Sequence, residues 1–375
     1  MPFMKNRGEQ TRPWRGLLWR LPFLLLLPAG LLLPRFAAGH AAWIESVYCA
    51  SLYPPVKDAL SAFTSLVPFS VAELLLYGVC VFVPLLLIVY LIRAFAKRRW
   101  RQLVSLLLSL AILAGGMITL FYPLWGLCYF RAPLAARMEL PVRERGKEEL
   151  YALTCFLARE AASVRDTLAE DGAGVFAVPG DAEDSFDALI PAYASLSAAL
   201  PVFSGKVTRA KPVLWSEGLS WAGIAGIYIG FTAEPNVNVD QPDLLIPAGA
   251  AHEMAHQLGI ASENEAEFVS YLACTHADVP AIRYSGLMHA LIACGNALYG
   301  ADAALFAEAA QLYSDGMRRD LAAYNAYWDA FEGPVEEYAT ATNDNYLKHN
   351  QQESGVKSYG EVVDLLLAWH SAENA

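Results

Sequence analysis

Residues 71–92 read VAELLLYGVCVFVPLLLIVYLI, and residues 103–127 read LVSLLLSLAILAGGMITLFYPLWGL. The first stretch carries one charged residue, Glu73 near its start, and the second carries none. A helix of about 20 mainly apolar residues is long enough to cross a bilayer, so both stretches predict membrane spans. These two segments therefore decide the fold class of the N-terminal third.

A third apolar stretch, residues 21–38, precedes them and is interrupted by Pro28, Pro34 and Arg35. It follows a basic N-terminal region, which also fits a signal peptide cleaved after the small residues at 37–39. We favour a retained first span, because two further spans follow and the apolar run is long. The signal-peptide interpretation stays open at this point.

The basic residues predict the orientation of the spans. They gather ahead of the first span and again between the second and third, from Arg93 to Arg101. Both groups belong in the cytoplasm by the positive-inside rule. We therefore expect a multi-pass protein of the cell membrane with a cytoplasmic N-terminus and residues 128–375 outside the cytoplasm. Residues 39–70 then form a short external loop, with a turn at Pro54-Pro55.

Composition excludes several classes of protein. The chain has 375 residues, of which 55% are hydrophobic and 17% charged, too apolar for a disordered polyelectrolyte. The net charge of −11 divides into +8 for residues 1–101 and −19 for the remainder. An acidic C-terminal part repels a polyanion, so we expect the lipid bilayer as a partner and no nucleic acid. The oligomeric state is left open.

Residues 128–375 are expected to form one mainly helical domain. Apolar periodicity predicts a strand at 222–232 and helices at 144–170, 185–200, 247–258, 263–275, 278–298, 301–330, 335–350 and 358–370. The predicted fold class is mainly α: an N-terminal three-helix transmembrane region (1–127) followed by a helix-rich α+β domain with a small sheet (128–375). Cys274 and Cys294 either pair or remain buried thiols, and we favour the thiols.

The chemistry is carried by Ala251-His252-Glu253-Met254-Ala255-His256-Gln257, an H-E-x-x-H motif in an apolar helical context. Residues four apart project from one face of a helix, so His252 and His256 are predicted to bind one Zn²⁺. Glu253 follows the first ligand and is predicted to act as the general base toward a water activated by the metal.

A zinc site of this kind needs a third protein ligand, and the next helix offers acidic residues. Gly259 fits a helix end at which the chain reverses, and Ser262 fits the start of a new helix. Glu263 and Glu267 share one face of that helix. We predict Glu263 as the third ligand and Glu267 as its alternative, or as the acceptor of the other N–H of a histidine. Glu265 is expected in a solvated first turn.

The whole chain resembles a bacterial family of three-span membrane proteins catalogued as domain of unknown function 3810. The resemblance implies a zincin-like C-terminal region. The matching stretches are 67–70 (VPFS), 73–77 (ELLLY), 252–257 (HEMAHQ), 263–268 (ENEAEF), 271–274 (YLAC), 343–350 (NDNYLKHN) and 358–360 (SYG).

A more distant similarity is to membrane zinc proteases of the CAAX-processing type, which pair H-E-x-x-H with a later E-x-x-A-D. Glu263 and Ala266 match this second motif, whereas Glu267 stands where those proteases have Asp. The similarity thus implies Glu263 as a ligand and leaves the contact expected of the Asp open.

Zincins hold an extended substrate along a strand ahead of the metal helix, and residues 224–232 are similar in position. The resemblance implies substrate binding by the backbone at Tyr228 and Gly230. Glu234 and Asn236 either fix a substrate terminus or form turns. Candidates for the donor that stabilises an oxyanion are Tyr271, Tyr346, Tyr359 and His289.

These features predict a membrane-anchored zinc metallopeptidase that hydrolyses peptide bonds of peptides or proteins outside the cytoplasm. The alternative is a non-catalytic receptor or assembly module with a structural zinc site. Intramembrane proteolysis is disfavoured, because the apolar run at 244–251 is too short to span a bilayer.

Overall fold

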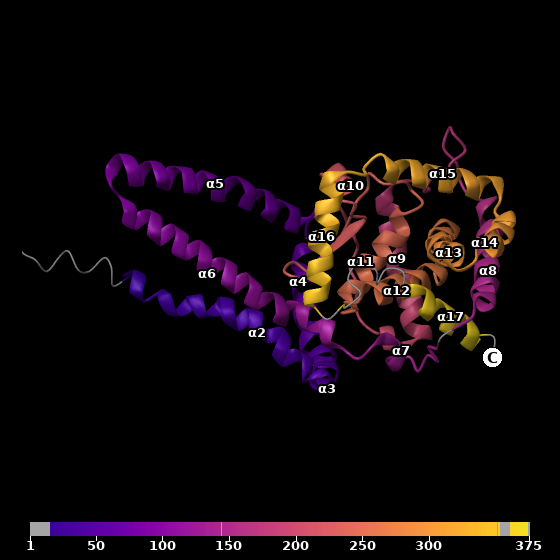
Figure 1. The fold of residues 1–375 in the computed structure, drawn as a ribbon, viewed down its shortest axis with the longest axis horizontal. Coiled ribbons are helices and arrows are strands. Elements are labelled where there is room, and N and C mark those ends of the chain that lie inside the picture. The colour runs from indigo at the N-terminus through magenta and orange to yellow at the C-terminus, as the bar shows by residue number, and fades with distance from the viewer. Residues whose placement is uncertain (1–15, 144, 351, 353–360, 374–375) are drawn as a thin grey trace, which may run out of the picture.

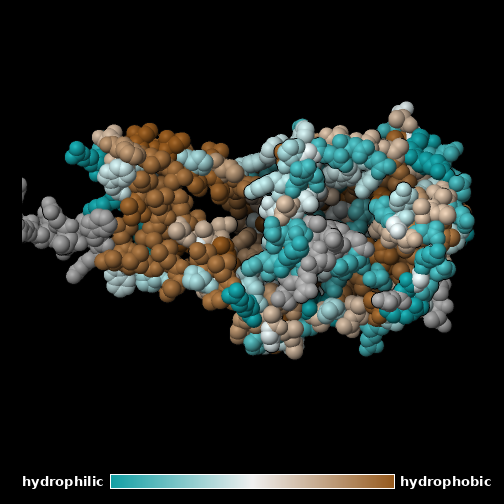
Figure 2. All heavy atoms as spheres, in the orientation of Figure 1, coloured by the Kyte–Doolittle hydropathy of each residue, from teal (hydrophilic) through white to brown (hydrophobic). Residues whose placement is uncertain are grey.

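The computed structural model describes residues 16–143, 145–350, 352 and 361–373. A long arm of three helices projects from one side of a globular, mainly helical part (Figure 1). In the described part of the chain, Gly16–Ala38, Val71–Lys97 and Trp100–Leu124 are long and apolar enough to cross a membrane. Figure 2 shows hydrophobic residues covering this arm and hydrophilic residues spread over the globular part. The chain is therefore a multi-pass membrane protein, as predicted.

The second and third spans begin and end near their predicted limits. Helix α5 (Val71–Lys97) begins where predicted, because Ser70 Oγ accepts a hydrogen bond from Glu73 N at 3.0 Å. It runs five residues past Ile92 and ends at Arg98, in the left-handed conformation with φ 48°. Helix α6 (Trp100–Leu124) ends three residues early, because the chain turns there into the 3₁₀-helix η3 (Gly126–Phe130).

The first span packs against the third. It comprises the 3₁₀-helix η1 (Leu21–Leu25) and α2 (Leu26–Ala38), which packs along α6. A Cβ added to Gly115 would lie 2.9 Å from Leu27 N, and one added to Gly30 would lie 2.9 Å from Thr119 N. These two glycines therefore let the backbones approach closely, the usual device of membrane helix packing.

The segment between the first two spans, predicted as a short loop with a turn at Pro54-Pro55, is helical. It forms α3 (Ala41–Trp43), the π-helix η2 (Ile44–Leu52) and α4 (Tyr53–Thr64). Pro54 and Pro55 lie in the first turn of α4 instead of forming a turn of their own. A proline costs little there, because the first N–H groups of a helix have no intrahelical partner.

The globular part is built from short helices around α11. Their bounds are α7 (Leu134–Arg137), α8 (Lys147–Arg165), α9 (Ala182–Ala199), η4 (Pro201–Phe203), α10 (Ser216–Trp221), α11 (Ile246–Gln257), α12 (Glu263–Thr275), α13 (Pro280–Ala301), α14 (Ala303–Ala309), η5 (Ala310–Leu312), α15 (Asp315–Asp329), α16 (Pro334–His349) and α17 (Val362–Glu373). The helix predicted at 301–330 is divided into α14, η5 and α15, since Ser314 caps a new helix. Residues 358–360 of the last predicted helix lie outside the described residues.

The small sheet has the strand order β1-β3-β2. Strand β2 (Gly226–Ile229) pairs antiparallel with β3 (Glu234–Val237), and β1 (Lys211–Pro212) pairs parallel with β3. The predicted strand at 222–232 therefore corresponds to the shorter β2, which lies at an edge. Strands β1 and β3 were not predicted, because two- and four-residue strands carry little periodicity.

Two apolar clusters hold the molecule together. The larger lies within the globular part and includes α11, of which every residue is buried. The smaller, named here the junction cluster, joins the spans to the globular part and consists of Ala37, Ile44, Tyr48, Cys49, Tyr53, Tyr122, Trp125, Cys128, Phe130, Tyr228, Ala233 and Ala261. All six cysteines are free thiols, including Cys274 and Cys294, which are buried.

Candidate metal centre

The metal motif lies on a hairpin of two buried helices. Helix α11 ends at Gln257, and Gly259 adopts φ 77°, the conformation in which glycine reverses a chain at little steric cost. Helix α12 starts at Glu263, after Ser262 at the N-cap position. The Ser262 hydroxyl bonds the Asn264 side chain at 2.5 Å and not a helical N–H. The hairpin thus has the predicted limits and brings the first turn of α12 back against α11.

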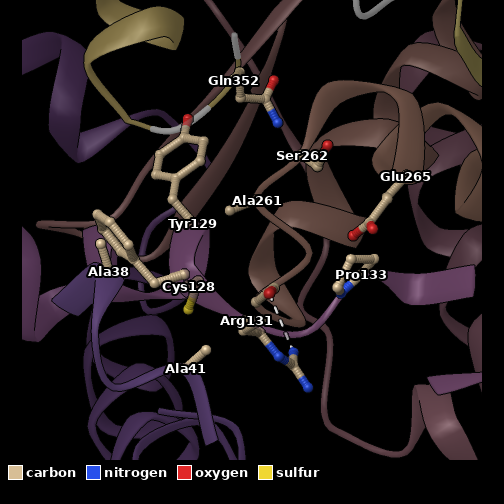
Figure 3. Close-up of a pocket in the computed structure, with 12 residues that line it drawn as sticks. Ala38, Ala41, Cys128, Tyr129, Arg131, Pro133, Ala261, Ser262, Glu265 and Gln352 are labelled. Atoms are coloured by element: carbon tan, nitrogen blue, oxygen red, sulfur yellow. Dashed lines mark hydrogen bonds between the residues drawn. The ribbon is translucent and has the colours of Figure 1, made fainter. Parts of the chain in front are cut away.

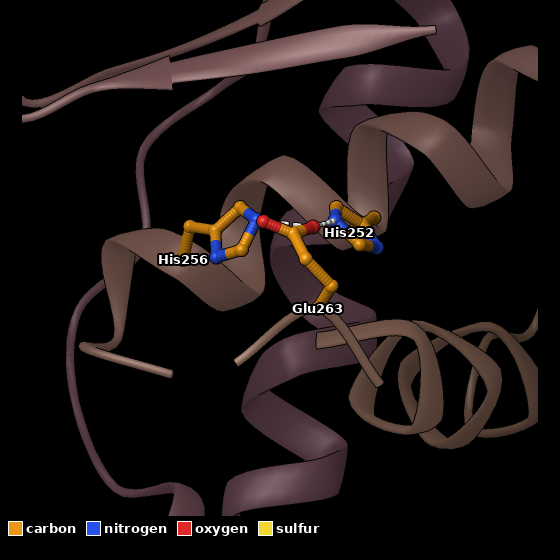
Figure 4. A group of neighbouring side chains, drawn as sticks. All are labelled: His252, His256 and Glu263. Carbon is orange, nitrogen blue, oxygen red and sulfur yellow. Dashed lines mark hydrogen bonds and ion pairs between the residues drawn. The ribbon is translucent and has the colours of Figure 1, made fainter. Parts of the chain in front are cut away.

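His252, His256 and Glu263 converge on one point (Figure 4). Glu263 Oε2 lies 3.2 Å from His252 Nε2 and 3.6 Å from His256 Nε2. Four ligands at zinc bond lengths in a tetrahedron are separated by roughly 3.3 to 3.6 Å. Two of the donor separations lie in or near this range, and all three donor atoms lie within 4.8 Å of one another, so the group could hold a metal ion.

Both imidazoles are oriented by a second contact on Nδ1, which leaves Nε2 for an ion. His252 Nδ1 lies 3.2 Å from Glu267 Oε2, and His256 Nδ1 lies 2.7 Å from the Ile260 carbonyl. The other Glu267 oxygen bonds His289 Nδ1. Such contacts fix the tautomer and ring orientation of metal-binding histidines. The sequence predicted Glu267 either as a ligand or in this role, and the geometry has it in contact with the ring.

Glu253 lies beside this group and is buried. Burial raises the pKa of Glu253 to about 7, against the opposing charges of His252 and His256. The Tyr228 backbone N–H donates to the carboxylate, while Oε2 has no hydrogen-bond partner among the described residues. An unpartnered buried carboxylate oxygen is costly, and it is expected where a reacting group must accept a proton.

The remaining acidic groups of the centre stay ionised. Burial alone raises the pKa of Glu263, but the imidazoles outweigh it and hold that pKa well below its usual range. Glu267 has a lowered pKa for the same reason, with His289 and His252 outweighing burial. Burial lowers the pKa of His252, but its bonds to Glu263 and Glu267 raise it overall. The centre thus brings carboxylates and imidazoles together in a buried space, the types of ligand that bind a metal ion.

The four residues predicted to bind substrate lie in β2, in β3 and in the turn between these strands. Tyr228 lies in the edge strand, and its hydroxyl bonds the Tyr53 hydroxyl at 3.2 Å. A Cβ on Gly230 would lie 2.6 Å from Trp125 Cβ, so this glycine allows a close approach. Asn236 donates to the carbonyls of Ile227 and Glu234, and its Oδ1 is unpartnered among the described residues.

Glu234 has a structural role instead of facing the centre. Its oxygens accept from Val71 N at 3.0 Å and Ala72 N at 2.9 Å, and it pairs with Lys211 Nζ at 2.6 Å. Glu234 therefore caps the second span. The sequence did not indicate this contact, because 163 residues separate Glu234 from Val71.

The surroundings of Glu265 also differ from the prediction. It is not in a solvated turn, since its carboxylate accepts from Leu134 N at 2.6 Å and burial raises its pKa. The α12 turn is covered there by α7, a contact that local sequence does not encode.

The candidate oxyanion donors are dispersed. Tyr271 lines a separate pocket with Trp369. His289 is engaged by Glu267. The Tyr346 hydroxyl bonds the Tyr129 hydroxyl at 3.3 Å. Burial raises the pKa of Tyr346, and the negative charge of the nearby Glu263 raises it further. Tyr359 lies outside the described residues.

The contact of Trp125 with His256 was not predicted from the sequence. Its indole N–H donates to the His256 carbonyl at 3.2 Å, and its ring meets the His256 ring edge-to-face at 5.8 Å between centroids. Trp125 directly follows the third span, where aromatic residues gather at membrane interfaces. That position was the available signal.

A pocket of about 310 Å³ lies at the turn between α11 and α12 (Figure 3). Its lining includes the reversing turn at Gly259 and Ser262, the C-terminal end of α2 at Ala38, and Arg131. Arg131 Nη1 donates to the Gly259 carbonyl at 3.1 Å. His252, His256 and Glu263 are not among its lining residues. The pocket thus adjoins the turn that carries the ligands and does not open onto the ligands themselves.

Fold and site together define a multi-pass membrane protein with a buried His-His-Glu group. The chain belongs to the family described as "Protein of unknown function (DUF3810)", whose model matches residues 48–367. No curated protein and no solved structure matches it.

Proposed function

We propose that this protein is a membrane-anchored zinc metallopeptidase that hydrolyses peptide bonds. One observation carries the proposal: two imidazole Nε2 atoms and one carboxylate oxygen converge at 3.2 and 3.6 Å beside a buried carboxyl with an unpartnered oxygen. A zinc ion held there supplies a Lewis acid that brings the pKa of a water molecule near 7.

The residues of the chain divide the remaining work. His252, His256 and Glu263 hold the ion, while Glu267 and the Ile260 carbonyl keep the rings oriented. Glu253 accepts the proton of the attacking water and passes it to the leaving amine, and the burial that raises the pKa of Glu253 favours proton uptake by this carboxylate.

The edge strand supports a peptide as the substrate. In the β2–β3 ladder, Asn238 N donates to the Ala225 carbonyl, so 225 and 238 form a hydrogen-bonded pair. Alternation along an antiparallel ladder turns the backbone groups of Gly226 and Tyr228 to the open edge. Tyr228 N already reaches Glu253 from that edge. An extended peptide added there would run past the general base, in the zincin manner.

The proposal also includes a location for residues 128–375 and one alternative function. The basic residues around the spans support a position outside the cytoplasm for residues 128–375. The alternative is a receptor or assembly module with a structural zinc, which the low exposure of His252, His256 and Glu263 (8%, 5% and 8%) favours. The likeness to CAAX-processing proteases rests on the motifs alone.

Elemental analysis and hydrolysis of a fluorescently labelled casein test the proposal on purified full-length protein. We expect about one zinc per chain in the wild type and in Glu253→Gln, with hydrolysis lost in the variant by roughly 10²-fold or more. His252→Ala loses both, and His276→Ala, a histidine bonded to the Leu272 carbonyl, loses neither.

The outcomes separate the candidates. Zinc with no hydrolysis in the wild type, and the same biological phenotype for wild type and Glu253→Gln, would favour the structural site. Undiminished zinc in a His252/His256 double alanine variant would refute the ligand assignment.

A further inference from the structure

The segment between the first and second spans has a mainly apolar outer surface. Its charged residues are Glu45, Lys57 and Asp58, whose side chains are 31%, 4% and 33% exposed. The exposed large apolar residues are Trp43, Val47, Leu52, Val56, Phe63, Leu66 and Phe69, which are 37–76% exposed. A helix facing water normally carries charged residues on its outer face, so this surface is not that of a solvated helix.

Two of the three charged residues of the segment contact residues beyond it. Glu45 pairs with Arg131 at 2.7 Å. Lys57 is buried, donates to the Lys206 carbonyl and pairs with Asp58 at 2.6 Å. The segment is therefore amphipathic, with Glu45 and Lys57 engaged on the protein side.

Both ends of the segment continue into the spans. Helix α2 ends at Ala38 and α5 begins at Val71, so the segment lies where these helices leave the bilayer. Figure 1 shows α3 and α4 at the base of the globular part, next to the arm. The apolar surface of the segment is therefore continuous with the apolar surface of the spans.

A second loop reaches the same level. Leu214 and Trp215 are 67% and 63% exposed, and their backbone N–H groups donate to Glu73 at 2.8 and 2.9 Å. Because Glu73 lies in the first turn of α5, this contact holds two large apolar side chains beside the start of a span.

We propose that Ala41–Phe69 and the Leu214–Trp215 loop form a membrane seat that lies in the plane of the bilayer. The exposed apolar face enters the boundary between headgroups and acyl chains, as in interfacial amphipathic helices. The globular part then rests on the membrane instead of standing off it on a linker.

The seat brings the metal helix to the membrane surface. Tyr53, on the buried face of α4, donates its hydroxyl to the Gln257 carbonyl at the end of α11 at 3.1 Å. Trp125, which follows the third span, donates to the His256 carbonyl. Two side chains at the membrane boundary therefore contact the turn of α11 that carries a ligand, whether or not the site is catalytic.

Spin-label accessibility tests the seat in the full-length protein, reconstituted in nanodiscs of phosphatidylcholine and phosphatidylglycerol. Single cysteines replace Val47, Val56 and Phe63 in a Cys80→Ser background, because Cys80 is the exposed native thiol. All three positions are exposed, so the labels fit without repacking, and gel filtration identifies any misfolded variant. Power saturation then compares collisions with oxygen, which enters lipid, and with a water-soluble nickel chelate.

Two matched positions calibrate the measurement. Val81, exposed on α5, reports lipid, and Tyr299, exposed at the end of α13, reports water. We expect the oxygen-to-nickel ratio at the three seat positions to exceed that at Tyr299 by roughly threefold or more and to approach the ratio at Val81. A ratio equal to that at Tyr299 overturns the proposal. Exclusion of both reagents also overturns it, because a second copy or another protein then covers the surface.

Discussion

Gly226→Ala perturbs the contact between the edge strand and Glu253, the proposed general base. A Cβ at Gly226 would lie 2.7 Å from Glu253 Oε1, 2.8 Å from Glu253 Cγ and 3.0 Å from the Asn236 carbonyl oxygen, where ordinary contact starts at 3.4 Å. Glu253 is buried and the Asn236 atom is backbone, so neither swings away freely. We therefore expect the strand or the carboxylate to move by about 0.7 Å.

A displacement of this size acts on catalysis and on stability. Misplacement of a reacting group by about 1 Å costs up to roughly 100-fold in rate, so kcat/KM should fall by about 10- to 100-fold. Zinc content should be unchanged, because the substitution does not touch a ligand. Overpacking should also lower the free energy of unfolding by about 1–3 kcal/mol. Casein hydrolysis, elemental analysis and thermal denaturation in detergent measure the three effects.

Gly249→Ala is the matched control. Gly249 lies on α11 itself, and a Cβ there would meet only Gln241 Nε2, at an ordinary 3.6 Å. Activity and melting temperature should stay at wild-type values or rise slightly, since alanine favours a helix. A Gly226→Ala protein with wild-type hydrolysis and wild-type melting temperature would refute the steric reasoning.

Three further predictions concern stability. Asp320→Asn should lower the free energy of unfolding by about 3–5 kcal/mol, because Asp320 and its partner Arg165 are 0% and 1% exposed. Glu170→Gln, at the exposed partner of Arg165, should leave the free energy of unfolding close to that of the wild type in the same denaturation assay. Although burial raises it, the bond and charge of Arg131 lower the pKa of Glu45 overall, so the pair stabilises above pH 4.5 and its contribution is lost as the pH falls further. The melting-temperature gap between wild type and Glu45→Gln should therefore narrow below pH 4.5, and a gap independent of pH would contradict this. A zinc chelator should lower the melting temperature of the wild type and leave that of the double-histidine variant unchanged.

The sequence was informative wherever the physics is local. The spans were predictable because crossing a bilayer imposes a length and an apolar composition on consecutive residues. The hairpin of the metal motif was predictable because i, i+4 spacing, Gly259 and Ser262 act within one or two helical turns. Its limits agree with those of the structure to within one residue.

The errors fall where distant segments meet. Residues 39–70 were predicted as a loop from their place between two spans and from Pro54-Pro55, whereas most of the segment is helical and its buried residues pack against distant parts of the chain. Glu234 and Glu265 were interpreted from their neighbours in sequence, whereas their carboxylates bind backbone N–H groups at positions 71, 72 and 134. Short strands such as β1 carry too few residues for a periodic signal.

The sequence by itself determined three apolar segments long enough to span a membrane, a mainly helical globular part, and two histidines one helical turn apart with an acidic residue shortly after them. Each of these follows from the composition or spacing of neighbouring residues. Only the tertiary structure decided that Glu267 contacts His252, that Gly226 packs against Glu253, and that Trp125 and Tyr53 bond the backbone at the end of α11. Those contacts join residues 15 to 204 positions apart, and chain folding alone brings such residues together.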